Sequence, residues 1–241
     1  MMKSRIIYIC LITILALTGC ESESTGGVSD ITNFAVIELE GDQDIFLEVG
    51  EEYIEPGATA TENGSPTPVT TTSYGLFTGQ PLNTDVIDIY NIEYSATNVD
   101  GYPASASRRV IVANTGNLVD DISGVYVSTV IRNGVSDSAY EDMTYIIIWK
   151  NEDGSFELSD GVGGYYMIGR AYGVAYAATG ATIMVNGLNN YTFGPEFGVG
   201  AFGGVAKITE MTVDPDAKTI NFKTDWDSEY LFDVYLTQVQ Y

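Results

Sequence analysis

The sequence predicts an all-β protein built from two antiparallel domains. Runs of Val, Ile, Thr, Tyr and Phe with alternating polarity recur from about residue 33 onward, and Gly, Asn and Asp turns separate them. No segment shows the 3.6-residue apolar period of an amphipathic helix. A short Thr-Gly-Asn stretch at 115–117 predicts a linker, so we expect domains at 33–114 and 118–241.

The first 19 residues have the pattern of a secretion signal. Lys3 and Arg5 precede an apolar run at 6–17, which is shorter than the roughly 20 residues that span a bilayer. The next residues, Leu-Thr-Gly followed by Cys20, resemble the bacterial lipobox. This resemblance implies cleavage after residue 19 and acylation of the Cys20 thiol. The lipid then anchors the protein to a membrane without embedding it.

A polar segment at 20–32 follows and is expected to act as a tether. It begins with Cys20-Glu-Ser-Glu, and acidic residues directly after the cysteine resemble the surface-export signal of Bacteroidetes lipoproteins. The resemblance implies an extracytoplasmic protein that is anchored in the outer membrane. A complete export signal would place it on the cell surface.

The first domain is expected to be a sandwich of short strands. Strand patterns appear at 36–39, 44–50, 53–60, 89–97 and 106–112. The dipeptide Asp100-Gly101 lies between the last two runs and is typical of a hairpin tip. Such spacing of short strands is typical of a β-sandwich.

The stretch Val-Gly-Glu-Glu-Tyr-Ile-Glu-Pro-Gly-Ala-Thr-Ala at 49–60 resembles the signature of a bacterial surface Ig-like domain, which is also repeated in a pesticidal crystal toxin. The later segment 90–101, which closes on 109–112, resembles the final hairpin of that family. The middle, 65–88, departs from the pattern because it is longer and richer in Thr and Pro. The resemblance implies a spacer or adhesion module and brings no catalytic residues.

The second domain is expected to form an antiparallel barrel or sandwich of about eight strands. Its strand patterns lie at 122–130, 145–150, 155–159, 208–213, 219–224 and 230–237. The layout resembles C-terminal domains of Bacteroidetes surface lipoproteins, some of which are lipocalin-like in shape. Barrel and sandwich both fit the sequence.

Composition excludes several kinds of chemistry. The chain has no histidine, and its two cysteines are Cys10, in the leader, and Cys20. The common Ser-His and Cys-His nucleophile systems and the usual zinc ligands are therefore missing. The net charge is −23, and loss of Lys3 and Arg5 with the leader leaves 8 basic and 33 acidic side chains, a net charge of −25. We therefore expect no enzyme activity, no nucleic-acid partner and no cofactor.

One segment stands out as a candidate ligand-binding region. Residues 160–204 contain 12 glycines in 45 positions, interleaved with aromatic residues. Aromatic faces can stack on the apolar faces of sugar rings, so the hypothesis is a glycan-binding face. The competing interpretation is that these aromatics pack inward against glycines of neighbouring strands, as is also expected of Trp149. The candidate ligand-binding residues are Tyr165, Tyr166, Tyr172, Tyr176 and Trp226.

Acidic turns at 151–153, 214–216 and 225–229 offer oxygen ligands that calcium could use, but none has the EF-hand spacing and calcium is not favoured. The sequence therefore predicts a non-catalytic lipoprotein that binds a glycan or assists glycan uptake. Its expected partners are the membrane, through the lipid, and a glycan or an outer-membrane uptake complex. The alternative is a structural or adhesion lipoprotein whose β-domains contact other proteins.

Overall fold

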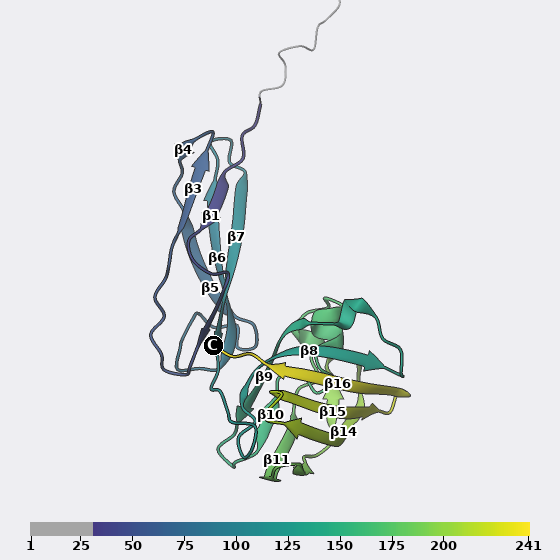
Figure 1. Cartoon of the computed structure of the whole chain (residues 1–241). Coiled ribbons are helices and arrows are strands. Elements are labelled where there is room, and N and C mark those ends of the chain that lie inside the picture. The colour runs from purple at the N-terminus through teal and green to yellow at the C-terminus, as the bar shows by residue number, and fades with distance from the viewer. Residues whose placement is uncertain (1–30) are drawn as a thin grey trace, which may run out of the picture.

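A computed structural model describes residues 31–241 of the chain. The expected signal at 1–19, the acylated Cys20 and most of the tether lie outside these residues. Within the described range no helix is long and apolar enough to cross a membrane. Two β-units are present, an elongated one above and a curled one beside its lower end (Figure 1).

The N-terminal unit is an Ig-like sandwich of two sheets, as the resemblance at 49–60 implied. The larger sheet has the order β2-β7-β6-β5, in which β2 runs parallel to β7. Its strands are β2 (Asp44–Leu47), β5 (Thr70–Gly75), β6 (Asp88–Thr97) and β7 (Pro103–Val112). The smaller sheet contains β1 (Val36–Leu39), β3 (Ala58–Glu62) and β4 (Ser65–Pro66). Alternate residues of β6 and β7, including Tyr90, Ile92 and Val110, form the core between the sheets.

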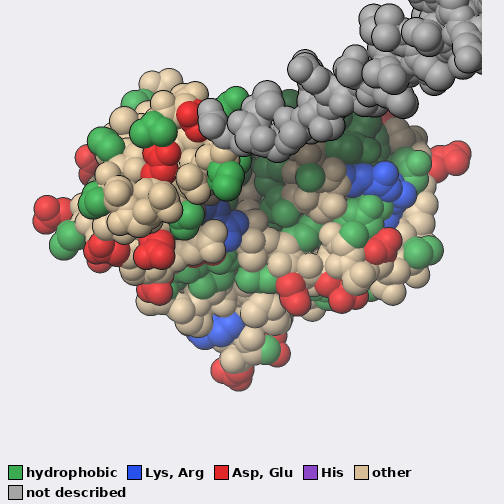
Figure 2. Space-filling view, turned by 90° about the horizontal axis from the view of Figure 1, so that it is seen from above, with side chains coloured by type: hydrophobic (Ala, Val, Ile, Leu, Met, Phe, Trp, Pro, Cys, Tyr) green, Lys and Arg blue, Asp and Glu red, His purple; other side chains and the backbone are tan. Residues whose placement is uncertain are grey.

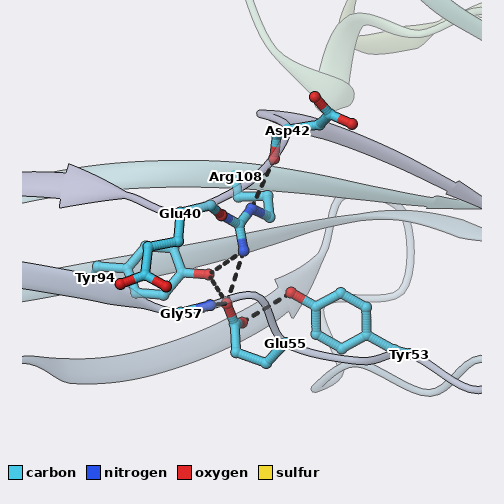
Figure 3. A network of polar contacts seen from close by, with 7 residues as sticks. All are labelled: Glu40, Asp42, Tyr53, Glu55, Gly57, Tyr94 and Arg108. Atoms are coloured by element: carbon cyan, nitrogen blue, oxygen red, sulfur yellow. Dashed lines mark hydrogen bonds and ion pairs between the residues drawn. The ribbon is translucent and has the colours of Figure 1, made fainter.

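A buried arginine ties the smaller sheet to the larger one. Arg108 on β7 is fully buried, and its guanidinium donates to Glu55 Oε1 at 2.7 Å and to the hydroxyl of Tyr94 at 3.2 Å (Figure 3). It also donates to the carbonyl oxygens of Glu40 and Asp42. This network explains why the expected strand at 53–60 is shorter in the structure. The residues before β3 form a loop in which the Glu55 side chain turns toward Arg108.

The C-terminal unit is one curled antiparallel sheet of nine strands in the order β12-β11-β10-β9-β8-β16-β15-β14-β13. The strands are β8 (Gly124–Arg132), β9 (Met143–Lys150), β10 (Phe156–Leu158), β11 (Ala181–Gly187), β12 (Asn190–Phe193), β13 (Phe197–Val199), β14 (Gly203–Asp214), β15 (Thr219–Trp226) and β16 (Tyr230–Gln238). Strands β12 and β13 form the two ends of the sheet. The domain is therefore a half-barrel, which is closer to the expected barrel than to the expected sandwich.

The hollow of the half-barrel is filled by the glycine-rich segment between β10 and β11. Ser128 Oγ donates to the carbonyl oxygen of Gly163 at 2.8 Å, which fixes this segment against β8. A Cβ on Gly163 would lie 2.5 Å from Val234 of β16, so only glycine permits this approach. The segment contains a single π-turn, η2 (Tyr165–Gly169), and a 3₁₀ turn, η3 (Val174–Tyr176). Two further 3₁₀ turns are η1 (Ser138–Tyr140) and η4 (Gly200–Phe202).

The two domains share a small core of their own. Ile89 and Ile111 of the Ig-like domain pack with Val125 and Ile147 of the half-barrel. Next to this core, Arg109 pairs with Asp44 at 2.6 Å, and the hydroxyl of Tyr145 donates to the same carboxylate at 2.9 Å. The junction is therefore both apolar and hydrogen-bonded.

Candidate functional site

An aromatic cluster occupies one end of the half-barrel. Each ring touches at least one other, with centroid distances from 3.9 Å for Tyr140 and Tyr165 to 6.4 Å for Tyr230 and Phe232. The turns η1, η2, η3 and η4 bring most of these rings to the end of the half-barrel where β15 is joined to β16. The cluster contains Tyr140, Tyr165, Tyr166, Tyr172, Tyr176, Phe202, Trp226, Tyr230 and Phe232.

The five residues singled out in the sequence all belong to this cluster, but they divide into two groups. Tyr165, Tyr166 and Trp226 are buried in its interior. Tyr176 is half-buried, and Tyr172 is 46% exposed. The buried group agrees with the interpretation that the aromatics pack inward. Tyr172 and Tyr176 reach the surface, and glycan binding by them stays a prediction.

Glycine packing accounts for the buried group. A Cβ on Gly169 would lie 2.4 Å from the ring of Tyr140, and one on Gly204 would lie 2.4 Å from Nε1 of Trp226. The rings thus lie directly on backbone that carries no side chain. This is the physical reason why glycines and aromatics alternate in the segment.

A pocket of about 350 Å³ opens beside the cluster. We call it the arginine–tyrosine pocket, because two arginines and three tyrosines dominate its wall. Arg132 comes from the end of β8, Arg170 follows η2, and the tyrosines come from η1, η2 and the start of β16. Its lining includes Arg132, Asp137, Tyr140, Tyr165, Arg170 and Tyr230.

The guanidinium of Arg132 is held between two aromatic rings. Its central carbon lies 4.8 Å from the ring centroid of Tyr165 and 4.4 Å from that of Tyr230. Both distances are within the range of cation–π attraction. One Nη donates to the hydroxyl of Tyr166 at 3.2 Å. The cation is therefore fixed in place while most of its five N–H donors remain available.

Arg170 connects the pocket to the exposed aromatics. Its central carbon lies 5.7 Å from the ring centroid of Tyr165. Polar contact with Tyr165 and Tyr172 raises the pKa of Arg170 above its ordinary value. Like other arginines, Arg170 is a cation at neutral pH. Burial raises the pKa of Tyr166, against a smaller opposing effect of the Arg132 hydrogen bond, so its hydroxyl stays protonated at neutral pH.

An exposed rim of aromatic residues adjoins the pocket. Tyr172 and Phe202 lie 6.3 Å apart between ring centroids, and each also packs on Tyr176. Phe202 is 47% exposed. We use "aromatic rim" for Tyr172, Tyr176 and Phe202. Seen from above, the half-barrel carries a compact group of basic side chains next to hydrophobic ones, whereas acidic side chains are scattered around both domains (Figure 2).

A second hollow, of about 480 Å³, lies at the domain junction and is lined by Phe77, Ile87, Ile147 and Trp149 among others. Trp149 is half-buried here and packs against the shared core of the two domains. The charged group in this hollow is the carboxylate of Asp85. It offers apolar packing but no cationic donor, so the arginine–tyrosine pocket is the better candidate for a polar ligand.

Two of the acidic turns, at 151–153 and 214–216, serve local structure. Asp153 Oδ1 accepts from the amide and hydroxyl of Ser155, and Asp214 Oδ1 accepts from the amides of Asp216 and Ala217. In residues 31–241 no group of three carboxylate, histidine or cysteine side chains is placed to hold a metal ion.

Sequence reasoning missed six members of the site, namely Arg132, Asp137, Tyr140, Arg170, Tyr230 and Phe232. Phe202 lies in the glycine-rich segment that stood out in the sequence but was not among the candidate residues. One signal was present, since outside the leader the chain has only four arginines. Arg132 and Arg170 are two of these, and each follows an apolar or aromatic run. Both arginines contact the ring of Tyr165 only because the fold brings distant segments together, and a local sequence pattern cannot show this.

Two family models match the chain. That of the bacterial surface protein Ig-like domain matches residues 37–112, and one described as a C-terminal domain matches residues 115–238. Among solved structures, the crystal structure of the lipoprotein BT2262 from Bacteroides thetaiotaomicron is similar, with 31% identity and a TM-score of 0.61. The similarity covers 85% of this chain and 100% of that one. No curated protein matches the chain.

Proposed function

The chain belongs to the family of the Bacteroides lipoprotein BT2262, and from this premise we propose that it is an outer-membrane lipoprotein that binds a glycan. In this proposal Cys20 carries the lipid, and the half-barrel binds the glycan at the aromatic rim and the adjoining pocket. The Ig-like domain holds the half-barrel away from the membrane.

The observation that carries this proposal is the exposure of Tyr172 and Phe202. Both rings are nearly half exposed, although each is packed on other members of a cluster that is otherwise mostly buried. Contiguous exposed apolar patches mark interaction sites, whereas apolar residues scattered singly over a surface are normal. Rigid rings lose little conformational entropy when a ligand stacks on them.

The surroundings of the rim suit a sugar. A sugar ring has an apolar C–H face and a periphery of hydroxyl groups, so its site needs aromatic faces with hydrogen-bonding groups beside them. Arg170 supplies donors next to Tyr172, and the carboxylate of Asp137 supplies an acceptor on the pocket wall. Both elements of a sugar site are therefore present within one small region.

The arrangement of the domains agrees with a spacer role for the Ig-like domain. The described chain enters this domain at the end remote from the half-barrel (Figure 1). An anchor attached upstream of residue 31 would thus be separated from the pocket by the length of the sandwich. The hydrogen-bonded junction at Asp44 and Arg109 would limit bending between the domains.

Affinity gel electrophoresis of residues 21–241 against host and plant polysaccharides tests the proposal. All strands lie between residues 36 and 238, so this fragment contains the whole fold. We expect one glycan to retard the protein and Tyr172→Ala or Phe202→Ala to abolish the retardation. Tyr235→Ala, which removes an exposed ring from the middle of β16, is the matched control and should bind normally.

Absence of retardation on every glycan would contradict the proposal and favour the adhesion alternative. Equal loss of retardation in Tyr172→Ala and Tyr235→Ala would also contradict it, because binding would then not depend on the rim. Circular dichroism of each variant separates loss of binding from loss of folding.

A further inference from the structure

The arginine–tyrosine pocket departs from the charge balance of the chain. The sequence contains 33 acidic side chains against 10 basic ones, so an arginine is expected to find a carboxylate partner. In the Ig-like domain this holds, since Arg108 pairs with Glu55 and Arg109 with Asp44. Among residues 31–241, neither Arg132 nor Arg170 takes part in an ion pair.

Both of these arginines line the same pocket. Arg132 is held between the rings of Tyr165 and Tyr230. Arg170 lies 5.7 Å from the ring centroid of Tyr165. Asp137 is the carboxylate on the pocket wall, and its Oδ1 accepts from the amide of Ala139 at 3.0 Å at the start of η1. The pocket therefore contains two cations that form no ion pair with a carboxylate of the described chain, although Asp137 lies on the same wall.

From this geometry we infer that the pocket binds the carboxylate group of an acidic sugar. The inference rests on the proposed function and narrows it from a glycan to one that carries a uronic acid or a related carboxylated unit. Guanidinium groups recognise carboxylates with paired, charge-assisted hydrogen bonds. The sugar ring that carries the carboxylate then lies against the tyrosines, and the rest of the glycan extends over the aromatic rim.

The size of the pocket and the charge of the chain limit the ligand further. A volume of about 350 Å³ is at the lower end for small-molecule sites, which fits one or two sugar rings. The net charge of −25 that remains without Lys3 and Arg5 repels a long polyanion. We therefore infer that the ligand is a single acidic sugar on an otherwise neutral glycan, such as a terminal glucuronic acid.

Isothermal titration of residues 21–241 with three matched disaccharides tests this inference. The first ends in glucuronic acid, the second in its uncharged methyl ester, and the third in glucose. We expect the acid to bind about tenfold or more tighter than the other two, since a hydrogen bond to a charged group has roughly this effect. A disaccharide that carries sulfate in place of the carboxylate distinguishes carboxylate recognition from general anion binding.

Variants locate the effect. Arg170→Gln removes an exposed cation and is expected to abolish the preference for the acid while leaving the fold intact. Arg132→Gln should do the same, but it also removes packing between two rings, so its folding needs a separate check. Lys207→Gln removes an exposed cation of β14 outside the pocket and is expected to leave the preference unchanged.

The outcomes separate this inference from the proposed function. Equal affinity for acid, ester and glucose, all of it dependent on Tyr172, would overturn the inference and leave glycan binding standing. Binding of the sulfated sugar as tight as that of the acid would overturn carboxylate selectivity. A preference for the acid that survives Arg170→Gln would overturn the assignment to this pocket. Binding of none of the sugars here, nor of any glycan by electrophoresis, would count against both.

Discussion

Replacement of Glu55 by Gln tests how the Ig-like domain is stabilised. Glu55 Oε1 accepts from Arg108, from the hydroxyl of Tyr94 at 2.7 Å and from the amide of Gly57 at 2.8 Å. Gln keeps the shape of the side chain and one acceptor oxygen but removes the charge. The variant therefore leaves the fully buried guanidinium of Arg108 without its counter-charge.

The magnitude follows from the burial of the two partners. Removal of one member of a buried ion pair costs about 3–5 kcal/mol. The side chain of Glu55 is 37% exposed, so solvent screens part of the loss and we expect about 2–3 kcal/mol. The matched control is Glu210→Gln, which breaks a pair of similar length, 2.9 Å, between two exposed side chains. We expect no measurable change in that variant.

Native-state hydrogen exchange measures this loss by region. The Ig-like domain contains no tryptophan, so fluorescence would report mainly the half-barrel. We expect amides of β6 and β7 to open more easily in Glu55→Gln and to be unchanged in Glu210→Gln. Equal protection of these strands in Glu55→Gln and the wild type would refute the argument that the buried pair stabilises the domain.

The pH dependence of stability provides a second test of the role of Glu55. Burial raises the pKa of Glu55, but hydrogen bonds from Tyr94, Gly57 and Tyr53 and the charge of Arg108 outweigh it and hold the pKa below its ordinary value. A carboxyl with a lowered folded-state pKa contributes stability above its unfolded pKa and loses it as pH falls through the folded value. The difference between wild type and Glu55→Gln should therefore shrink in acid.

Three further predictions concern the half-barrel and the junction. Burial raises the pKa of Asp160 to about 6 despite amide donors, so its folded form loses stability as pH rises from 4 to 6, by about 3 kcal/mol. Asp160→Asn should therefore gain stability relative to wild type over that interval in urea titrations followed by tryptophan fluorescence, and parallel profiles would contradict this. Gly169→Ala would place a Cβ 2.4 Å from the Tyr140 ring, and this overpacking should lower the free energy of unfolding by about 1–3 kcal/mol in the same titrations. An unchanged midpoint would show that the Tyr140 ring moves aside without cost. Tyr145→Phe removes the 2.9 Å hydrogen bond to Asp44 and should cost about 1 kcal/mol, seen as faster exchange at the domain junction; unchanged exchange there would show that the apolar core alone holds it.

Local patterns predicted most strands of the structure because those strands have one buried face. Along most of β6 and β7 buried residues alternate with more exposed ones, so periodicity agrees with the observed strands. At 88–90 and 110–112 both faces are buried, because the half-barrel packs there. The stretch at 53–60 was different. Its residues favour a strand, but the partner that decides its conformation is Arg108, more than 50 residues later.

The candidate site was only partly predictable for the same reason. The alternation of glycine and aromatic residues indicated close packing and also indicated a binding surface, and the structure contains both buried and exposed aromatic rings. Which tyrosine faces solvent depends on η2, where a π-turn places Tyr165 and Tyr166 inside together although they are adjacent in sequence. The pairing of Arg132 with Tyr230 joins strands almost 100 residues apart, which no local pattern contains.

A crystal structure of the chain with the glycan that retards it tests the central claim most directly. The account predicts one sugar ring against Tyr172 and Phe202, and the carboxylate of a neighbouring ring within hydrogen-bonding distance of Arg132 or Arg170. A sugar bound instead in the junction hollow, against Phe77 and Trp149, would contradict the assignment of the site to the half-barrel.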